Sequence, residues 1–140
     1  MSPAADHPRG GGSAEHPRGR ATPQVQRWID EAVAVLAANG DDTTRLDPSD
    51  IWTIIVHESG GDPRAVNDWD SNAAGGTPSE GIMQTIGPTF AAYALPGHGD
   101  IWDPVNNIIA ACRYILDRYR TTAQVPGVAA LRSGGVYEGY

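Results

Sequence analysis

Glu58 is the residue of this 140-residue chain whose type and position most clearly indicate chemistry. It is the only charged side chain on an apolar stripe with the helical spacing i, i+3, i+4 and i+7, formed by Ile51, Ile54, Ile55 and Glu58. Burial on such a face disfavours the charged form of a carboxyl and predicts a raised pKa. A carboxylic acid that stays protonated near neutral pH can serve as the general acid that cleaves a glycosidic bond. The stripe therefore indicates chemistry on sugar chains, with an exposed or locally bonded carboxyl at the helix end as the alternative.

Two further groups of residues have the types that a sugar site needs. In Gly81-Ile82-Met83-Gln84, the glycine permits an unusual backbone or a close ligand approach, and the glutamine can both donate and accept hydrogen bonds. Asn107, Ala111 and Tyr114 lie at i, i+4 and i+7, which gives a polar, small and aromatic face on one helix. The same face could instead pack against the central loop, with Asn107 bonded to the backbone. Met83 suits the core as well as a contact, and Trp69 in a polar loop is a candidate for stacking on sugar.

The segments that position these residues have clear start and stop signals. Thr22-Pro23, Asp47-Pro48 and Asp103-Pro104 are each typical of an N-cap followed by proline in the first helical turn. Gly40 is expected to end the first helix and Gly60-Gly61 the helix that carries Glu58. Shorter helices are predicted over 88–94 and 125–132. Residues 61–85 are rich in Gly, Asn, Asp, Ser and Pro, which favours loops or short strands.

The composition limits the classes of function. The formal net charge is −7, and all ten basic residues are Arg. An acidic body is poorly suited to nucleic acids or anionic membranes, and no stretch is apolar and long enough to span a bilayer. Cys112 is the only cysteine, so neither an intramolecular disulfide nor a cysteine metal cluster is expected.

Metal motifs are incomplete in this sequence, so no metal or other cofactor is expected. His57-Glu58 begins like a zinc-protease motif, but Gly61 stands where the second histidine belongs. Asp68, Asp70 and Asn72 alternate as in a calcium loop. However, Ala73 and Ser79 occupy the positions of its turn glycine and its bidentate glutamate.

The first 21 residues differ in composition from the rest. Residues 6–10 and 15–19 form a near-repeat, Asp/Glu-His-Pro-Arg-Gly, and the whole segment lacks aliphatic side chains other than alanine. Such a segment cannot offset the entropy of ordering, so residues 1–21 are predicted to be a disordered tail or linker. It has no apolar core of a signal peptide. One domain is therefore predicted over residues 22–140.

Taken in order, these motifs resemble the soluble lytic transglycosylase (SLT) domain of the lysozyme-like superfamily. The matching pieces are Glu58-Ser59, Gly81-Ile82-Met83-Gln84, and Asn107-Ile108 with Tyr114. The resemblance covers about residues 28–119 and is strongest to SLT domains of actinobacteria and of phage tape-measure proteins. Ala111 replaces the more usual glycine, and the end of the chain around Tyr137 lacks the common Tyr-Asn-Ala-Gly form. The implied fold is mainly α (α+β, lysozyme-like), a helical domain with a loop-rich or short-hairpin insert beside the catalytic helix.

The resemblance implies a lytic transglycosylase that acts on peptidoglycan glycan strands. Glu58 would serve as the single acid and base, forming 1,6-anhydro-N-acetylmuramic acid ends without a metal or cofactor. The implied substrate-binding residues are Ser59, Gly81, Met83, Gln84, Asn107 and Tyr114, together with Trp69. A monomeric domain is expected, acting outside the cell at the wall or in a phage virion tail.

Two alternatives remain open from the sequence. One is a muramidase that hydrolyses the same bond with a second carboxylate, for which the candidates are Asp62, Asp68, Asp70 and Glu80. The other is a structural or wall-binding module with no catalytic activity. The intact Glu58-Ser59 pair favours an enzyme over this module.

Overall fold

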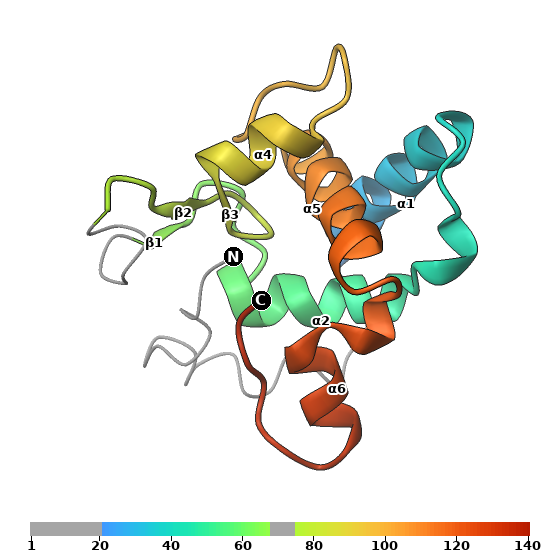
Figure 1. Cartoon of the computed structure of the whole chain (residues 1–140), viewed down its shortest axis with the longest axis vertical. Coiled ribbons are helices and arrows are strands. Elements are labelled where there is room, and N and C mark those ends of the chain that lie inside the picture. Colours follow the sequence, from blue (N-terminus) through green and yellow to red (C-terminus); the bar gives the residue numbers. More distant parts are fainter. Residues whose placement is uncertain (1–20, 68–74) are drawn as a thin grey trace.

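Three long helices begin where the capping signals predicted them. The computed structural model describes residues 21–67 and 75–140, and in it α1 (Pro23–Ala38), α2 (Pro48–Ser59) and α5 (Pro104–Arg118) form the body of the fold (Figure 1). The side chains of Thr22, Asp47 and Asp103 each accept a hydrogen bond from a backbone N–H of the following turn. These bonds satisfy donors that a helix start otherwise leaves unpaired.

The remaining elements are short. They comprise the helices α4 (Gly87–Tyr93) and α6 (Pro126–Arg132), the 3₁₀ turns η3 (Thr43–Arg45) and η4 (Thr122–Gln124), and the strands β1 (Val66–Asn67), β2 (Ser79–Glu80) and β3 (Thr85–Ile86). The strands pair in the antiparallel order β1-β2-β3, and Ser79 and Glu80 of β2 lie opposite Ile86 and Thr85 of β3. The mainly α prediction with a short-strand insert is confirmed. The predicted tail, apart from Ala21, and Trp69 lie outside the described residues.

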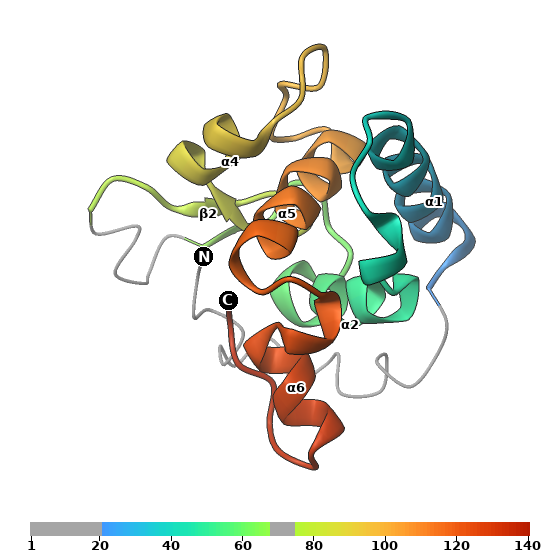
Figure 2. The same ribbon diagram turned by 45° about the vertical axis from the view of Figure 1, so that its right-hand side comes forward.

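The core lies where α5 packs between α1 and α4, with α2 crossing below (Figures 1 and 2). Its fully buried aliphatic side chains include Ile29, Leu36, Ile51, Ile54, Ile55, Ile108, Ile109 and Ile115. The predicted stripe of α2 is therefore buried along its whole length, and Glu58 continues it. Within the described residues, no helix is long and apolar enough to cross a membrane.

The start of α2 is tied to the C-terminal part of the chain by a buried carboxylate. Asp50 is 5% exposed and accepts hydrogen bonds from Arg132 Nη2 at 2.6 and 2.8 Å and from Thr122 Oγ1 at 3.0 Å. The Thr122 hydroxyl in turn accepts a bond from the backbone N–H of Asp47. These contacts fix α6 and η4 on α2.

We expect Asp50→Ala to lower the free energy of unfolding by about 2 kcal/mol, because Arg132 and Thr122 lose charge-assisted hydrogen bonds. Urea denaturation followed by circular dichroism measures the change. Asp30→Ala is the matched control, since Asp30 lies on the exposed face of α1 and bonds only Gln26 among the contacts described. Equal free energies of unfolding for the two variants would show that the bonds from Asp50 to Arg132 and Thr122 do not stabilise the fold.

The buried thiol and phenols predict a loss of stability in alkali. Burial raises the pKa of Cys112 from 9.0 to about 12, and burial together with the neighbouring Tyr119 raises that of Tyr114 from 10.0 to about 12. The folded state therefore keeps protons that the unfolded chain has released. Stability is fully present below pH 9 and is lost as the pH rises toward 12.

Urea midpoints at about pH 8 and about pH 10.5 should show this decrease, and Cys112→Ala should show a smaller one. The alanine variant isolates the contribution of the thiol, whose ordinary pKa is the lower of the two. Midpoints that do not change over this range would show that neither group gains its proton affinity from folding.

Candidate active site

Glu58 lies in the last turn of α2, where the chain must leave the helix. Gly60 adopts the left-handed conformation with φ 67°, and its N–H bonds the carbonyls of Ile55 and Val56. The Glu58 side chain is 1% exposed. Among the described residues, Asp50 and Glu58 are the buried carboxylates, and Asp50 is held by Arg132 at the other end of the helix.

Tyr137 supplies the hydrogen bond that defines the surroundings of Glu58. Its hydroxyl donates to Glu58 Oε2 at 2.9 Å, and the residue is 3% exposed. Burial, and next the charge of Glu58, raise the pKa of Tyr137 well above its ordinary value. The phenol therefore stays protonated, and remains a hydrogen-bond donor, across the neutral range.

Ser59 joins the end of α2 to the segment Gly81–Gln84. Its hydroxyl donates to the carbonyl of Ile82 at 2.6 Å and accepts from the N–H of Gly61 at 3.1 Å. These bonds close the end of α2 and attach it to the 81–84 turn. The residue is buried, and its role in substrate binding stays a prediction.

Asn107 and Gly81 interlock at the centre of the domain. Asn107 Oδ1 accepts from the N–H of Met83 at 2.9 Å, while Nδ2 donates to the carbonyls of Ile101 and Glu80 and to Thr85 Oγ1. Gly81 has φ 86°, and a Cβ there would lie 2.2 Å from Asn107 Nδ2. Only glycine fits both the conformation and the space. Asn107 is thus bonded to the backbone, and its role in substrate binding stays a prediction.

Met83 and Gln84 complete the same turn and are fully buried. Gln84 Nε2 donates to the carbonyls of Ala65 and Gly81, both at 2.9 Å. The carbonyl of Met83 accepts from the hydroxyl of Tyr140 at 2.9 Å. These hydrogen bonds fix the 81–84 turn, which forms one wall of the candidate site. The contact of Met83 and Gln84 with substrate stays a prediction.

Tyr114 connects the face of α5 to this wall through aromatic contacts. Its half-buried ring lies 5.7 Å from that of Tyr93, 6.0 Å from that of Tyr119 and 6.2 Å from that of Tyr140. Edge-to-face and tilted arrangements of this kind stabilise aromatic pairs. The structure therefore brings Glu58, Ser59, the 81–84 turn, Asn107 and Tyr114 into one connected region.

The candidates for a second carboxylate have different surroundings. Asp62 is exposed and accepts a bond from the N–H of Arg64, and Glu80 is half-buried in β2. Asp68 and Asp70 lie outside the described residues. In the part of the chain that the structure describes, no cluster of three or more His, Cys, Asp or Glu residues could hold a metal ion.

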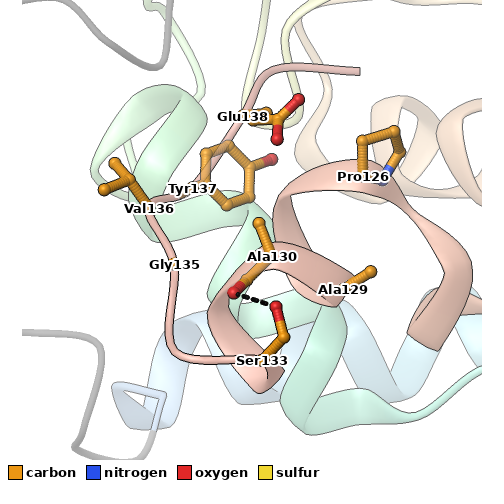
Figure 3. A pocket seen from close by; sticks show the side chains of 8 residues that line it. All are labelled: Pro126, Ala129, Ala130, Ser133, Gly135, Val136, Tyr137 and Glu138. Carbon is orange, nitrogen blue, oxygen red and sulfur yellow. Dashed lines mark hydrogen bonds between the residues drawn. The ribbon is translucent and has the colours of Figure 1, made fainter.

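The sequence reasoning missed Tyr137 and Tyr140, which lie in the C-terminal tail (residues 133–140). This tail passes α6 and reaches the end of α2 (Figure 1). An open groove of about 840 Å³ lies between α6 and the tail, with Tyr137 among its lining residues (Figure 3). The available signal was a pair of tyrosines three residues apart in a glycine-rich end.

The helical body, the small sheet and the buried glutamate at the end of α2 define a lysozyme-like domain. Residues 36–134 match the family described as the transglycosylase SLT domain, and the chain belongs to this family. It is also 52% identical over 90 residues to a Bacillus subtilis (strain 168) protein named uncharacterized protein YqbO. That match covers 64% of this chain and 6% of the relative, so this chain spans a small part of the relative's length. No solved structure gives a significant match.

Proposed function

We propose that this domain is a peptidoglycan lytic transglycosylase in which Glu58 acts first as acid and then as base. The observation that carries the proposal is the burial of Glu58 at the end of α2 with the Tyr137 hydroxyl on Oε2. Membership in the SLT family supports glycosidic-bond cleavage in peptidoglycan as the reaction class. The proposed site of action is the cell wall or a phage virion tail.

The reaction would proceed in two steps at one carboxyl. Protonated Glu58 donates its proton to the oxygen that links N-acetylmuramic acid to N-acetylglucosamine, and the glycosidic bond breaks. The acetamido oxygen of the substrate stabilises C1. The carboxylate then accepts the proton of the C6 hydroxyl, whose oxygen bonds C1 and closes the 1,6-anhydro ring. No water is consumed.

The hydrogen bond from Tyr137 suits this two-step reaction, because Glu58 alternates between a neutral acid and a carboxylate. Burial favours the neutral acid that begins the reaction, whereas the phenol donates a hydrogen bond that is strongest to the carboxylate formed after the first step. General acid–base catalysis requires a pKa near the working pH, and burial and the hydrogen bond act on this pKa in opposite directions.

The positions of the buried carboxylates favour one acid over two. Asp50, the other buried carboxylate of the described residues, is engaged by Arg132 and lies eight residues away, about 12 Å along the helix. It cannot act on the same bond. A hydrolase would therefore have to use a carboxylate outside α2, such as Asp62 or Glu80 of β2.

Substrate access requires a local rearrangement. Because Glu58 is 1% exposed, a glycan strand reaches it only when a segment that covers it moves.

Mass spectrometry of the products from purified sacculi tests the proposal. We expect muropeptides that end in 1,6-anhydro-N-acetylmuramic acid and are lighter by one water than the hydrolysis products. Glu58→Gln should release none. Reducing ends would establish the muramidase alternative, and the absence of products from the wild type would favour a binding module.

A further inference from the structure

The ring of Tyr137 stacks on His57, the residue that precedes Glu58. The two ring centroids lie 4.5 Å apart with an interplanar angle of 17°. The His57 ring is itself fixed, because Nδ1 lies 2.8 Å from the carbonyl of Thr53 one turn earlier in α2. A carbonyl oxygen only accepts, so Nδ1 carries the proton and the ring orientation is set by the helix. The stacking surface therefore has a fixed position relative to the Glu58 carboxyl.

Gly127 of α6 lies against the same Tyr137 ring. A Cβ at Gly127 would lie 2.3 Å from Cε1 and 2.4 Å from Cδ1 of Tyr137, and 2.3 Å from the carbonyl oxygen of Glu138. Glycine within a helix is less favourable than alanine by about 1 kcal/mol. The backbone of Gly127 does not lie in the left-handed region, so the space taken by Tyr137 and the tail is what demands glycine there.

The helix that carries Gly127 cannot shift freely. Arg132 binds Asp50 of α2, and the N–H of Gly135 bonds the carbonyl of Ala130 at 2.7 Å, which turns the tail back along α6 (Figure 3). His57 on α2 and Gly127 on α6 are thus two surfaces of one rigid slot around the Tyr137 ring.

We propose that His57 and Gly127 are positioning residues that hold the Tyr137 phenol so that its hydroxyl reaches Glu58. The inference rests on the proposed function for its kinetic consequences. Neither residue needs to touch the substrate. Each acts through Tyr137, so their effects on turnover must disappear when the tyrosine hydroxyl is absent.

A double-mutant cycle tests this coupling. Loss of a hydrogen bond to a charged group predicts that Tyr137→Phe lowers kcat about 10- to 100-fold. Gly127→Ala should lower kcat to a similar extent with little change in KM. His57→Phe, which keeps a ring for stacking, should lose less activity than His57→Ala. In the Tyr137→Phe background, His57→Ala and Gly127→Ala should cause no further loss.

Gly99→Ala is the matched control, since Gly99 has an ordinary backbone and nothing within 4 Å of an added Cβ. It should leave kcat unchanged. The proposal would be overturned if His57→Ala or Gly127→Ala lowered kcat by the same factor in the Tyr137→Phe protein as in the wild type. Equal losses of kcat for His57→Phe and His57→Ala would also overturn it. The His57 variants decide the question even if Gly127→Ala fails to fold.

A readout that does not depend on activity separates this inference from the proposed function. Carboxyl carbon NMR gives the pKa of Glu58 directly, with Glu58→Gln for assignment. His57→Ala, Gly127→Ala and Tyr137→Phe should raise this pKa together, because each removes the donor to the carboxylate. Tyr140, whose pKa is raised by burial and next by the charge of Glu58, is not substituted in any of these variants. A wild-type pKa in the His57→Ala and Gly127→Ala proteins would refute positioning, whereas a wild type without anhydro products would refute only the enzymatic proposal.

Discussion

Glu58→Gln is expected to reduce the release of anhydro-muropeptides at least about 10³-fold, because one residue supplies both proton-transfer steps and each contributes 10²–10⁴-fold. Glutamine has nearly the same shape as glutamate, and its carbonyl oxygen can still accept the bond from Tyr137. The amide cannot transfer the proton. The variant should therefore bind sacculi like the wild type in a pull-down, and its initial rate by muropeptide chromatography should fall to background.

The same substitution should leave the free energy of unfolding unchanged or higher. A buried ionisable carboxyl is replaced by a neutral group, and active-site residues are commonly suboptimal for stability. Glu31→Gln, on the exposed surface of α1, is the control and should keep full activity. Turnover above about a tenth of the wild-type rate in the Glu58→Gln protein would exclude Glu58 as the general acid.

The long helices could be predicted because their signals are local. The N-cap and proline pairs before α1, α2 and α5 fall within a few residues of the helix starts, and the stripe of α2 repeats within three turns. Strands of two residues offer no periodicity to detect. Short strands were predicted within residues 61–85, but their bounds depend on the pairing of Val66 with Glu80 and of Ser79 with Ile86, which the residue types do not specify.

The sequence could propose residue types for the candidate site, but it could not give their contacts. From the sequence, a polar side chain that binds a ligand cannot be distinguished from one that bonds a buried backbone group. Asn107 and Gln84 both bond the backbone. Tyr137 reaches Glu58 from 79 residues away. That contact depends on how α6 docks on α2 through Arg132 and Asp50, so the glycine-rich tail alone could not reveal it.

The interlock of Asn107 with the 81–84 turn leads to the largest expected effect on stability. Asn107→Ala would leave the N–H of Met83 and the carbonyls of Ile101 and Glu80 without their side-chain partner. Because each unsatisfied buried group costs about 1–3 kcal/mol, we expect the free energy of unfolding to fall by about 3–5 kcal/mol. Urea denaturation at low temperature, where the variant stays folded, measures the change.

Asn106→Ala provides a control of the same residue type one position away. Asn106 is half-buried and bonds His98 Nδ1 through Oδ1, so its loss should cost about 1 kcal/mol or less. Asn107→Asp separates the two ends of the amide, because it keeps the acceptor for Met83 and loses the donor to Ile101, Glu80 and Thr85. It should be as unstable as the alanine variant. If Asn107→Ala were no less stable than Asn106→Ala, the interlock would contribute little to folding and substrate contact would become the better account of Asn107.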